Sequence, residues 1–145
     1  MNLQVPIKTN KERFFLEYVS LMKPYYEAFL SKDMNTEVRL PQLNQLKIIA
    51  YLMYYNYVFQ EMEEDIRWMY IFDTETRIKM RYKTGMNPAV FDNVLHLLKD
   101  KGVFEEYTYE GKKRKKLKKY FNLKLDGPQV NVVFQFNIIE DTKGK

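Results

Sequence analysis

Two adjacent sets of helix boundary signals constrain the fold of this 145-residue chain more than any other feature. Asp73 or Thr74 can cap one helix, and Gly85 can end it, because glycine readily adopts the left-handed conformation that follows a helix terminus. Asn87 can cap the next helix, and Pro88 fits its first turn. The sequence therefore predicts two short helices joined by a tight turn.

The second of these helices leads directly into a hairpin. Its apolar residues recur at helical spacing and predict an inward stripe of Phe91, Val94, Leu95 and Leu98. Gly102 closes the helix, and Val103-Phe104 begins a strand. The arms of the hairpin are expected at about residues 103–109 and 117–125, with Gly111 in the turn.

A run of basic residues is expected at the tip of this hairpin. Residues 112–119 carry seven basic side chains, whereas the whole chain has a formal net charge of +5, so the remainder sums to 5 − 7 = −2. Like charges at this density repel one another unless an anion or solvent screens them, so the run predicts an anion-binding site. With Lys or Arg at nearly every position, it is not expected to form an amphipathic core strand. The flanking Tyr107, Tyr109 and Tyr120 can hydrogen-bond phosphates or stack on unpaired bases.

The N-terminal part of the chain is expected to be helical. Thr9 and Glu12 have the spacing of a capping box, which predicts a helix from about Asn10. Pro24 removes an amide donor and should break or kink that helix before it resumes. Residues 31–37 are expected to form a linker.

Local patterns predict three further segments. Leu40-Pro41 starts a second helix, which is apolar over so much of its circumference that it should be buried on more than one side. The β-prone stretch 66–72 predicts a short strand. Residues 130–138 partly alternate and predict another strand, followed by a polar tail from Asp141.

The composition argues against several classes of protein. The chain has no Cys, which excludes a disulfide framework, a Cys-ligated zinc site and a thiol nucleophile. It has one His, no cluster of residues with metal spacing, no Gly-rich phosphate loop and no nucleophile elbow. We therefore expect neither an enzyme nor a bound cofactor or metal.

The hydropathy pattern indicates no membrane association. The longest apolar stretch, Ile48 to Phe59, has about a dozen residues, and a membrane span needs roughly 20. The N-terminus has no apolar region of the kind found in signal peptides. The expected location is cytoplasmic: the host cytoplasm, or a virion, if the chain is phage-encoded, which would suit its Lys- and Tyr-rich composition.

The stretch Thr84 to Phe104 resembles the winged helix superfamily of bacterial and phage DNA-binding proteins. The similar elements are the Gly turn, an apolar residue, a polar cap, a helix with paired apolar positions, and Lys-Gly before a hydrophobic strand start. Extended by the basic hairpin as the wing, the resemblance covers about a third of the chain. The chain lacks the C-terminal dimerisation helices of repressors of the multiple-antibiotic-resistance type, so a homodimer would use the N-terminal helices.

This resemblance implies an α+β fold: a winged helix-turn-helix with two extra N-terminal helices and a C-terminal β-hairpin or strand region. The expected segments are an N-terminal helical extension over residues 1–38, the winged helix-turn-helix over 39–125, and a C-terminal strand and polar tail over 126–145.

The resemblance also implies which residues meet DNA. The helix after Asn87 would be the recognition helix, with outward positions Pro88, Ala89, Asp92, Asn93, His96 and Lys99. Asn93 can pair bidentately with adenine, and His96 can donate to a base or a phosphate. Asp92 argues against base reading, because phosphate repels a carboxylate near the groove, where it is tolerated mainly opposite a cytosine amine. The expected DNA-contacting residues are Arg77, Arg81, Asn87, Ala89, Asn93, His96, Lys112, Lys113, Arg114, Lys115, Lys116, Lys118 and Lys119.

Two functions remain open at this point. In the first, the protein binds double-stranded DNA as a transcriptional regulator or replication accessory factor, and the wing contacts phosphates. In the second, it is a phage or virion assembly or adaptor protein. Its wing then meets an acidic partner protein, and its aromatic N-terminal helices form the subunit interface. Salt-dependent binding to random duplex DNA separates the two.

Overall fold

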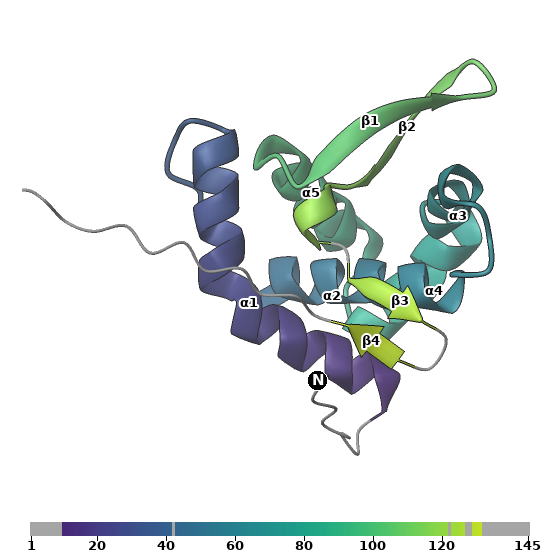
Figure 1. Cartoon of the computed structure of the whole chain (residues 1–145), viewed down its shortest axis with the longest axis horizontal. Coiled ribbons are helices and arrows are strands. Elements are labelled where there is room, and N and C mark those ends of the chain that lie inside the picture. Colours follow the sequence, from purple (N-terminus) through teal and green to yellow (C-terminus); the bar gives the residue numbers. More distant parts are fainter. Residues whose placement is uncertain (1–9, 42, 122, 127–128, 132–145) are drawn as a thin grey trace, which may run out of the picture.

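Helices form most of the described chain, and two antiparallel hairpins complete an α+β fold (Figure 1). The structure is a computed structural model that describes residues 10–41, 43–121, 123–126 and 129–131. Its helices are α1 (Lys11–Asp33), α2 (Leu43–Val58), α3 (Glu64–Ile71), α4 (Thr74–Thr84) and α5 (Pro88–Asp100). Its strands are β1 (Phe104–Tyr109), β2 (Lys112–Leu117), β3 (Lys124–Asp126) and β4 (Gln129–Asn131), with the short 3-10 helix η1 (Lys119–Phe121) before β3.

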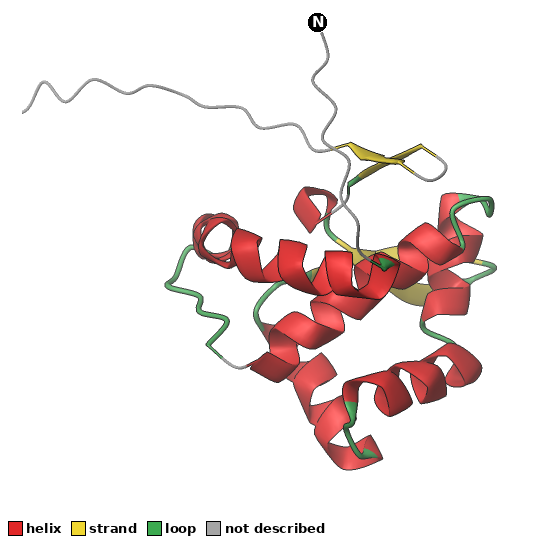
Figure 2. Ribbon diagram, turned by 90° about the horizontal axis from the view of Figure 1, so that it is seen from below, coloured by secondary structure: helices red, strands yellow, loops and turns green. Residues whose placement is uncertain are grey.

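One apolar core joins the N-terminal helices to the rest of the described chain. Its centre is α2, where Ile48, Ile49 and Leu52 are fully buried, so the prediction that this helix is buried on more than one side is confirmed. α1 packs along α2. Tyr26 of α1 also contacts Phe121 of η1, with the ring centroids 4.6 Å apart. Figure 2 shows the small β3–β4 hairpin standing apart from the packed helices.

α1 is a single bent helix. Its N-cap is Asn10, whose side-chain oxygen accepts a hydrogen bond from the amide of Arg13 at 2.7 Å, whereas the expected cap Thr9 lies outside the described residues. The helix continues through Pro24 and changes direction along its length (Figure 1), so the predicted kink is confirmed. It also continues to Asp33, so the linker predicted from residue 31 was placed too early.

Two sequence-based expectations about the next segments were wrong. α2 begins at Leu43, and Pro41 precedes the helix. Residues 66–72 form most of α3 and its C-terminal cap, where a strand was predicted. In α3 the buried residues are Trp68 and Ile71, three positions apart, which is the spacing of a helix that packs on one face. β-propensity depends strongly on context, and here packing against the core outweighs it.

The boundaries of α4 and α5 agree with the sequence-based prediction. The Asp73 side chain accepts a hydrogen bond from the amide of Thr76 at 2.9 Å, and Gly85 has the left-handed φ of 71°. The Asn87 side chain accepts from the amide of Val90 at 2.9 Å. Both helix starts are therefore fixed by side chains close in sequence.

The β1–β2 hairpin differs from the prediction in its second arm. β1 pairs with residues 112–117, from Phe104 opposite Leu117 to Tyr109 opposite Lys112. The two-residue turn is Glu110-Gly111, both with positive φ (51° and 74°), a combination suited to a tight hairpin. The basic run therefore forms strand β2 and not the tip. Of the strand predicted at 130–138, only its first residues lie in the described chain, in β4.

Candidate nucleic-acid interface

The outward face of α5 is polar and accessible. Asn93 and His96 are exposed, and the remaining expected outward positions, Pro88, Ala89, Asp92 and Lys99, are exposed as well. The predicted inward stripe of Phe91, Val94, Leu95 and Leu98 is buried. α5 therefore presents an amide, an imidazole and an ammonium group to solvent, and such groups can contact base edges and phosphates.

Asn87 plays a structural part at the start of this face. Its side-chain oxygen is engaged as the N-cap of α5 through the hydrogen bond to Val90, although the residue is exposed. Ala89 lies in the first turn beside it and is exposed. The N-terminal end of α5, which would enter a groove, is thus fixed by the Asn87 cap. Asn93 lies about one and a half turns along the helix from this end.

Strand geometry distributes the basic run over two sides of the hairpin. Successive side chains in a strand point to opposite sides, and directly paired residues point to the same side. One side, which we call the α5 side, carries Phe104, Glu106, Thr108, Lys113, Lys115 and Leu117, and the opposite side carries Glu105, Tyr107, Tyr109, Lys112, Arg114 and Lys116. Only part of the run therefore lies on the same side as α5.

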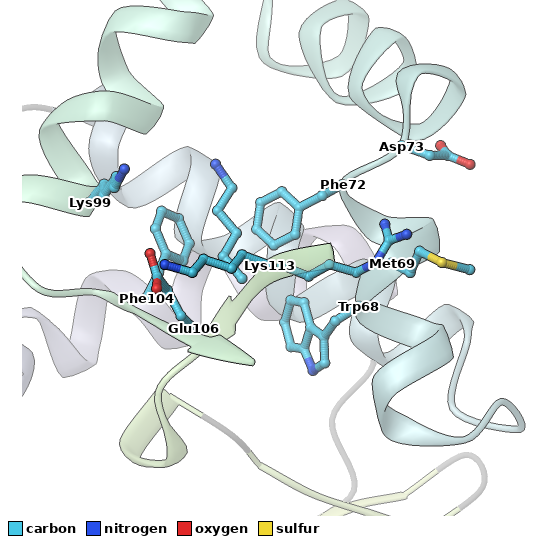
Figure 3. A pocket seen from close by; sticks show the side chains of 10 residues that line it. Trp68, Met69, Phe72, Asp73, Lys99, Phe104, Glu106 and Lys113 are labelled. Carbon is cyan, nitrogen blue, oxygen red and sulfur yellow. The ribbon is translucent and has the colours of Figure 1, made fainter. Parts of the chain in front are cut away.

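Cations from three elements gather between α5 and the α5 side of the hairpin. Lys99 of α5 lines the same pocket as Lys113 and Lys115 of β2 (Figure 3). Arg77 of α4 reaches across to α5, where it donates to Asp92 at 2.8 Å. The tertiary structure thus brings cations from α4, α5 and β2 together beside α5.

Lys115 is the most enclosed cation of this surface. Its ammonium lies 4.9 Å from the ring centroid of Phe72 and 5.3 Å from that of Phe104. Burial lowers the pKa of Lys115, and the neighbouring charges of Arg77 and Lys99 lower it further, while Asp92 acts in the opposite direction. A charged group held near other cations and away from water gains from the approach of an anion.

Two of the expected DNA-contacting lysines form ion pairs with acidic residues of the protein itself. Lys116 lies 3.5 Å from Glu64 and 3.9 Å from Asp65, at the first turn of α3. Lys118 forms an ion pair with Asp33 at the end of α1. These pairs hold the hairpin to the helices, and they reduce the charge that each lysine offers to a ligand.

The remaining residues of the run differ in exposure. Lys112 and Lys119 are exposed, and neither forms an ion pair within the described residues. Arg114 is half-buried and lines the edge of the pocket, where its Nε has no hydrogen-bond partner in the described chain. The hydroxyl of Tyr107 donates to the backbone oxygen of Asp65 at 2.6 Å. This bond anchors the side of the hairpin opposite the α5 side to α3.

The basic residues of α4 are also partly engaged. Arg81 follows Arg77 by one turn and is half-buried. Lys83 pairs with Glu12 of α1, and Lys79 lies 3.6 Å from Glu75 of its own helix. Arg77 is therefore the residue of α4 that reaches the surface shared with α5 and β2.

The sequence-based set omitted the aromatic part of this surface. Trp68 and Phe72 line the pocket together with Phe104 (Figure 3). Trp68 and Phe72 belong to the segment that was predicted as a strand. Their rings lie on the same face because residues four apart are separated by about one helical turn. A helical assignment of 66–72 would have placed both on one face beside Asp73.

Two features that would favour other functions are absent from the described chain. Within these residues no three His, Cys, Asp or Glu side chains are grouped closely enough to hold a metal ion. The same part of the chain contains no helix with the length and apolar character needed to cross a bilayer.

Comparisons with known proteins return no match. Neither the family models, nor the curated proteins, nor the solved structures contain a significant relative of this chain.

Proposed function

We propose that this protein binds double-stranded DNA through a winged helix-turn-helix formed by α4, α5 and the β1–β2 hairpin. α5 is the recognition helix, and β1–β2 is the wing. The order of these elements supports the assignment, because a helix, a tight turn, a second helix and a hairpin follow directly in the chain. The cellular role that fits this activity is transcriptional regulation or an accessory step in replication.

The observation that carries the proposal is the shared cationic surface of α4, α5 and β2. Arg77, Lys99, Lys113 and Lys115 come from these three elements, and α5 also exposes Asn93 and His96. Such a cluster attracts DNA phosphates whatever the base sequence. The amide of Asn93 and the imidazole of His96 can distinguish bases. In this proposal the α5 side of the wing contacts the backbone, and α5 enters the major groove.

A salt titration with matched double variants tests the proposal. Lys99→Ala with Lys113→Ala removes two cations of the shared surface, whereas Lys112→Ala with Lys119→Ala removes two exposed cations from outside it. On a random-sequence duplex, the slope of log affinity against log salt is negative, and the first double variant should make it shallower by about 1.8, because each phosphate that a lysine neutralises contributes about 0.9 to its magnitude. The second should change the slope much less. Equal effects of the two double variants would contradict the site, and absence of duplex binding by the native chain would contradict the function.

A second candidate function, assembly through protein–protein association, rests on the exposed face of α1. Between Ser20 and Phe29 every exposed residue of this helix is uncharged: Ser20, Leu21, Pro24, Tyr25, Ala28 and Phe29. Leu21 is 69% exposed and Phe29 46%. An apolar stripe of this kind fits a homodimer or a partner protein. Light scattering on the native chain and on Leu21→Ser with Phe29→Ser tests this function: a complex that dissociates in the variant supports it, and a monomer in both contradicts the homodimer.

A further inference from the structure

The pocket between α3, α5 and the hairpin combines aromatic and cationic groups. It has a volume of about 570 Å³, within the range of small-molecule sites. Trp68, Phe72 and Phe104 provide its aromatic surface. Lys99, Lys113, Arg114 and Lys115 supply positive charge around it, and they outnumber the two carboxylates of the lining, Asp73 and Glu106. A site for a simple anion does not need the rings, and a site for an apolar ligand does not need three ammonium groups.

The side chain of Lys115 occupies the position where a flat ligand would lie. Its ammonium is 4.9 Å from the ring centroid of Phe72 and 5.3 Å from that of Phe104, and the two rings meet edge to face at 5.6 Å. Lys115 forms no ion pair within the described residues. Its interaction with the rings is of the cation–π type, and a flexible four-carbon stem lets the ammonium move away. A ligand that offers both a flat ring and an anion can replace both interactions of this lysine.

We propose that this pocket accommodates one unstacked nucleotide. The base lies against Phe72 and Phe104, and the phosphate lies between Lys99, Lys113 and the displaced ammonium of Lys115. Aromatic side chains stack on any base, since every base has a π face, and lysine binds phosphate as a point charge. The shared chemistry is that of a nucleotide, which a strand with an unpaired end or a free mononucleotide can provide.

For a nucleic-acid ligand, the inference rests on the proposed function and extends it. A protein that holds a duplex on α5 and an unpaired nucleotide in the adjoining pocket prefers duplexes with a single-stranded overhang to blunt ones. Stacking of one base contributes about 1–3 kcal/mol, and even its lower limit corresponds to a preference of about fivefold.

Trp68 provides a direct readout, because it is the only tryptophan of the chain and lines the pocket. The 145-residue chain is titrated with a blunt duplex, the same duplex with a three-nucleotide overhang, deoxythymidine monophosphate, and inorganic phosphate. The overhang should raise the affinity at least about fivefold over the blunt duplex and change the Trp68 fluorescence. Deoxythymidine monophosphate should change the fluorescence at concentrations where phosphate does not.

Phe104→Leu keeps an apolar side chain but removes the ring, so it should abolish the preference for the overhang over the blunt duplex. Phe29→Leu is the matched control, since it removes a ring on α1 that packs against Tyr120 instead. Circular dichroism verifies that both variants fold.

Three results would overturn the inference: equal binding of overhang and blunt duplexes without a fluorescence change, equal responses to the mononucleotide and phosphate, or a preference that survives Phe104→Leu. If no duplex binds, the proposed function fails by itself. The mononucleotide response then decides the pocket: a Trp68 change supports a nucleotide site, and its absence refutes one.

Discussion

The guanidinium of Arg77 on α4 donates a hydrogen bond to the carboxylate of Asp92 on α5, with Nη2 and Oδ1 2.8 Å apart. In the sequence alone, the negative charge of Asp92 counted against DNA binding by this helix. In the structure the positive charge of Arg77 offsets it. Both side chains are substantially exposed, 41% for Arg77 and 61% for Asp92, so the pair contributes little to stability. Its main effect is to reduce the positive charge of the surface.

Replacing Asp92 by Asn should therefore strengthen DNA binding. The variant releases Arg77 for a phosphate and removes a repulsive charge, so the negative slope of log affinity against log salt should become steeper by about 0.9. Fluorescence anisotropy with a labelled duplex measures it. Asp100→Asn is the control on the same helix, because it removes the same charge beside His96, 3.7 Å away, without releasing Arg77. Weaker binding by Asp92→Asn would mean that this carboxylate contacts a base.

Substitutions of Lys99 and Lys101 should affect DNA binding and folding stability differently. Lys101 donates to the backbone oxygen of Arg39 at 2.6 Å and to the side chain of Gln45 at 2.7 Å, so Lys101→Ala should lower the free energy of unfolding by about 1–2 kcal/mol. Lys99 is exposed, and Lys99→Ala should leave stability within about 0.5 kcal/mol while it weakens DNA binding. Urea unfolding and anisotropy on both variants give the comparison. A reversed pattern would contradict the assigned roles.

Two neighbouring surfaces of β2 should respond differently to substitution. Lys116 pairs with Glu64 and lies 5.2 Å from the ring centroid of Tyr107, with only 18% of its side chain exposed. Lys116→Ala should therefore cost about 1 kcal/mol of stability in urea unfolding. Lys113→Ala, at an exposed position on the α5 side, should cost little stability and should weaken DNA binding more. If Lys116→Ala weakens binding as much as Lys113→Ala without loss of stability, the division of the strand into two sides is functionally irrelevant.

The turn between α4 and α5 should tolerate only residues that accept a left-handed backbone. Gly85 has φ of 71°, and a Cβ there would meet no atom within 4 Å, so the cost of a substitution is conformational and not steric. Gly85→Ala should destabilise the fold by about 1 kcal/mol, and Gly85→Asn by less, because Asn adopts this conformation more readily. Thermal unfolding of both variants measures the difference. Equal stability of the native chain and Gly85→Ala would show that the turn can relax.

Lys115 should give the protein a pH dependence at alkaline pH. Burial and the neighbouring cations lower its pKa below the ordinary 10.5, so its charge is lost at a lower pH than that of an exposed lysine. Because the unfolded chain binds the proton more tightly, the contribution of this residue to the free energy of unfolding rises with pH between the lowered pKa and 10.5. Binding to an anion should weaken over the same window, since it favours the charged form. Lys115→Met should remove this part of the pH dependence, and an unchanged profile in that variant would contradict it.

Local signals determined a large part of the fold. The caps Asp73 and Asn87, the left-handed Gly85 and the apolar stripe of α5 were correctly predicted, because each depends on interactions within a few residues. The exposed positions of α5 followed from the same periodicity. The expectation of DNA binding by these residues remains a proposal, since charge and exposure are consistent with it but do not test it.

The identity of the basic surface was decided only by the tertiary structure. The composition of residues 112–119 predicted a continuous cationic tip, but β pairing with residues 104–109 turns alternate side chains to opposite sides. Acids distant in sequence then engage some of them: Glu64 and Asp65 engage Lys116, and Asp33 engages Lys118. Strand register and the proximity of elements far apart in the chain depend on the packed core. No local pattern could therefore assign Lys113 and Lys115 to the surface shared with α5.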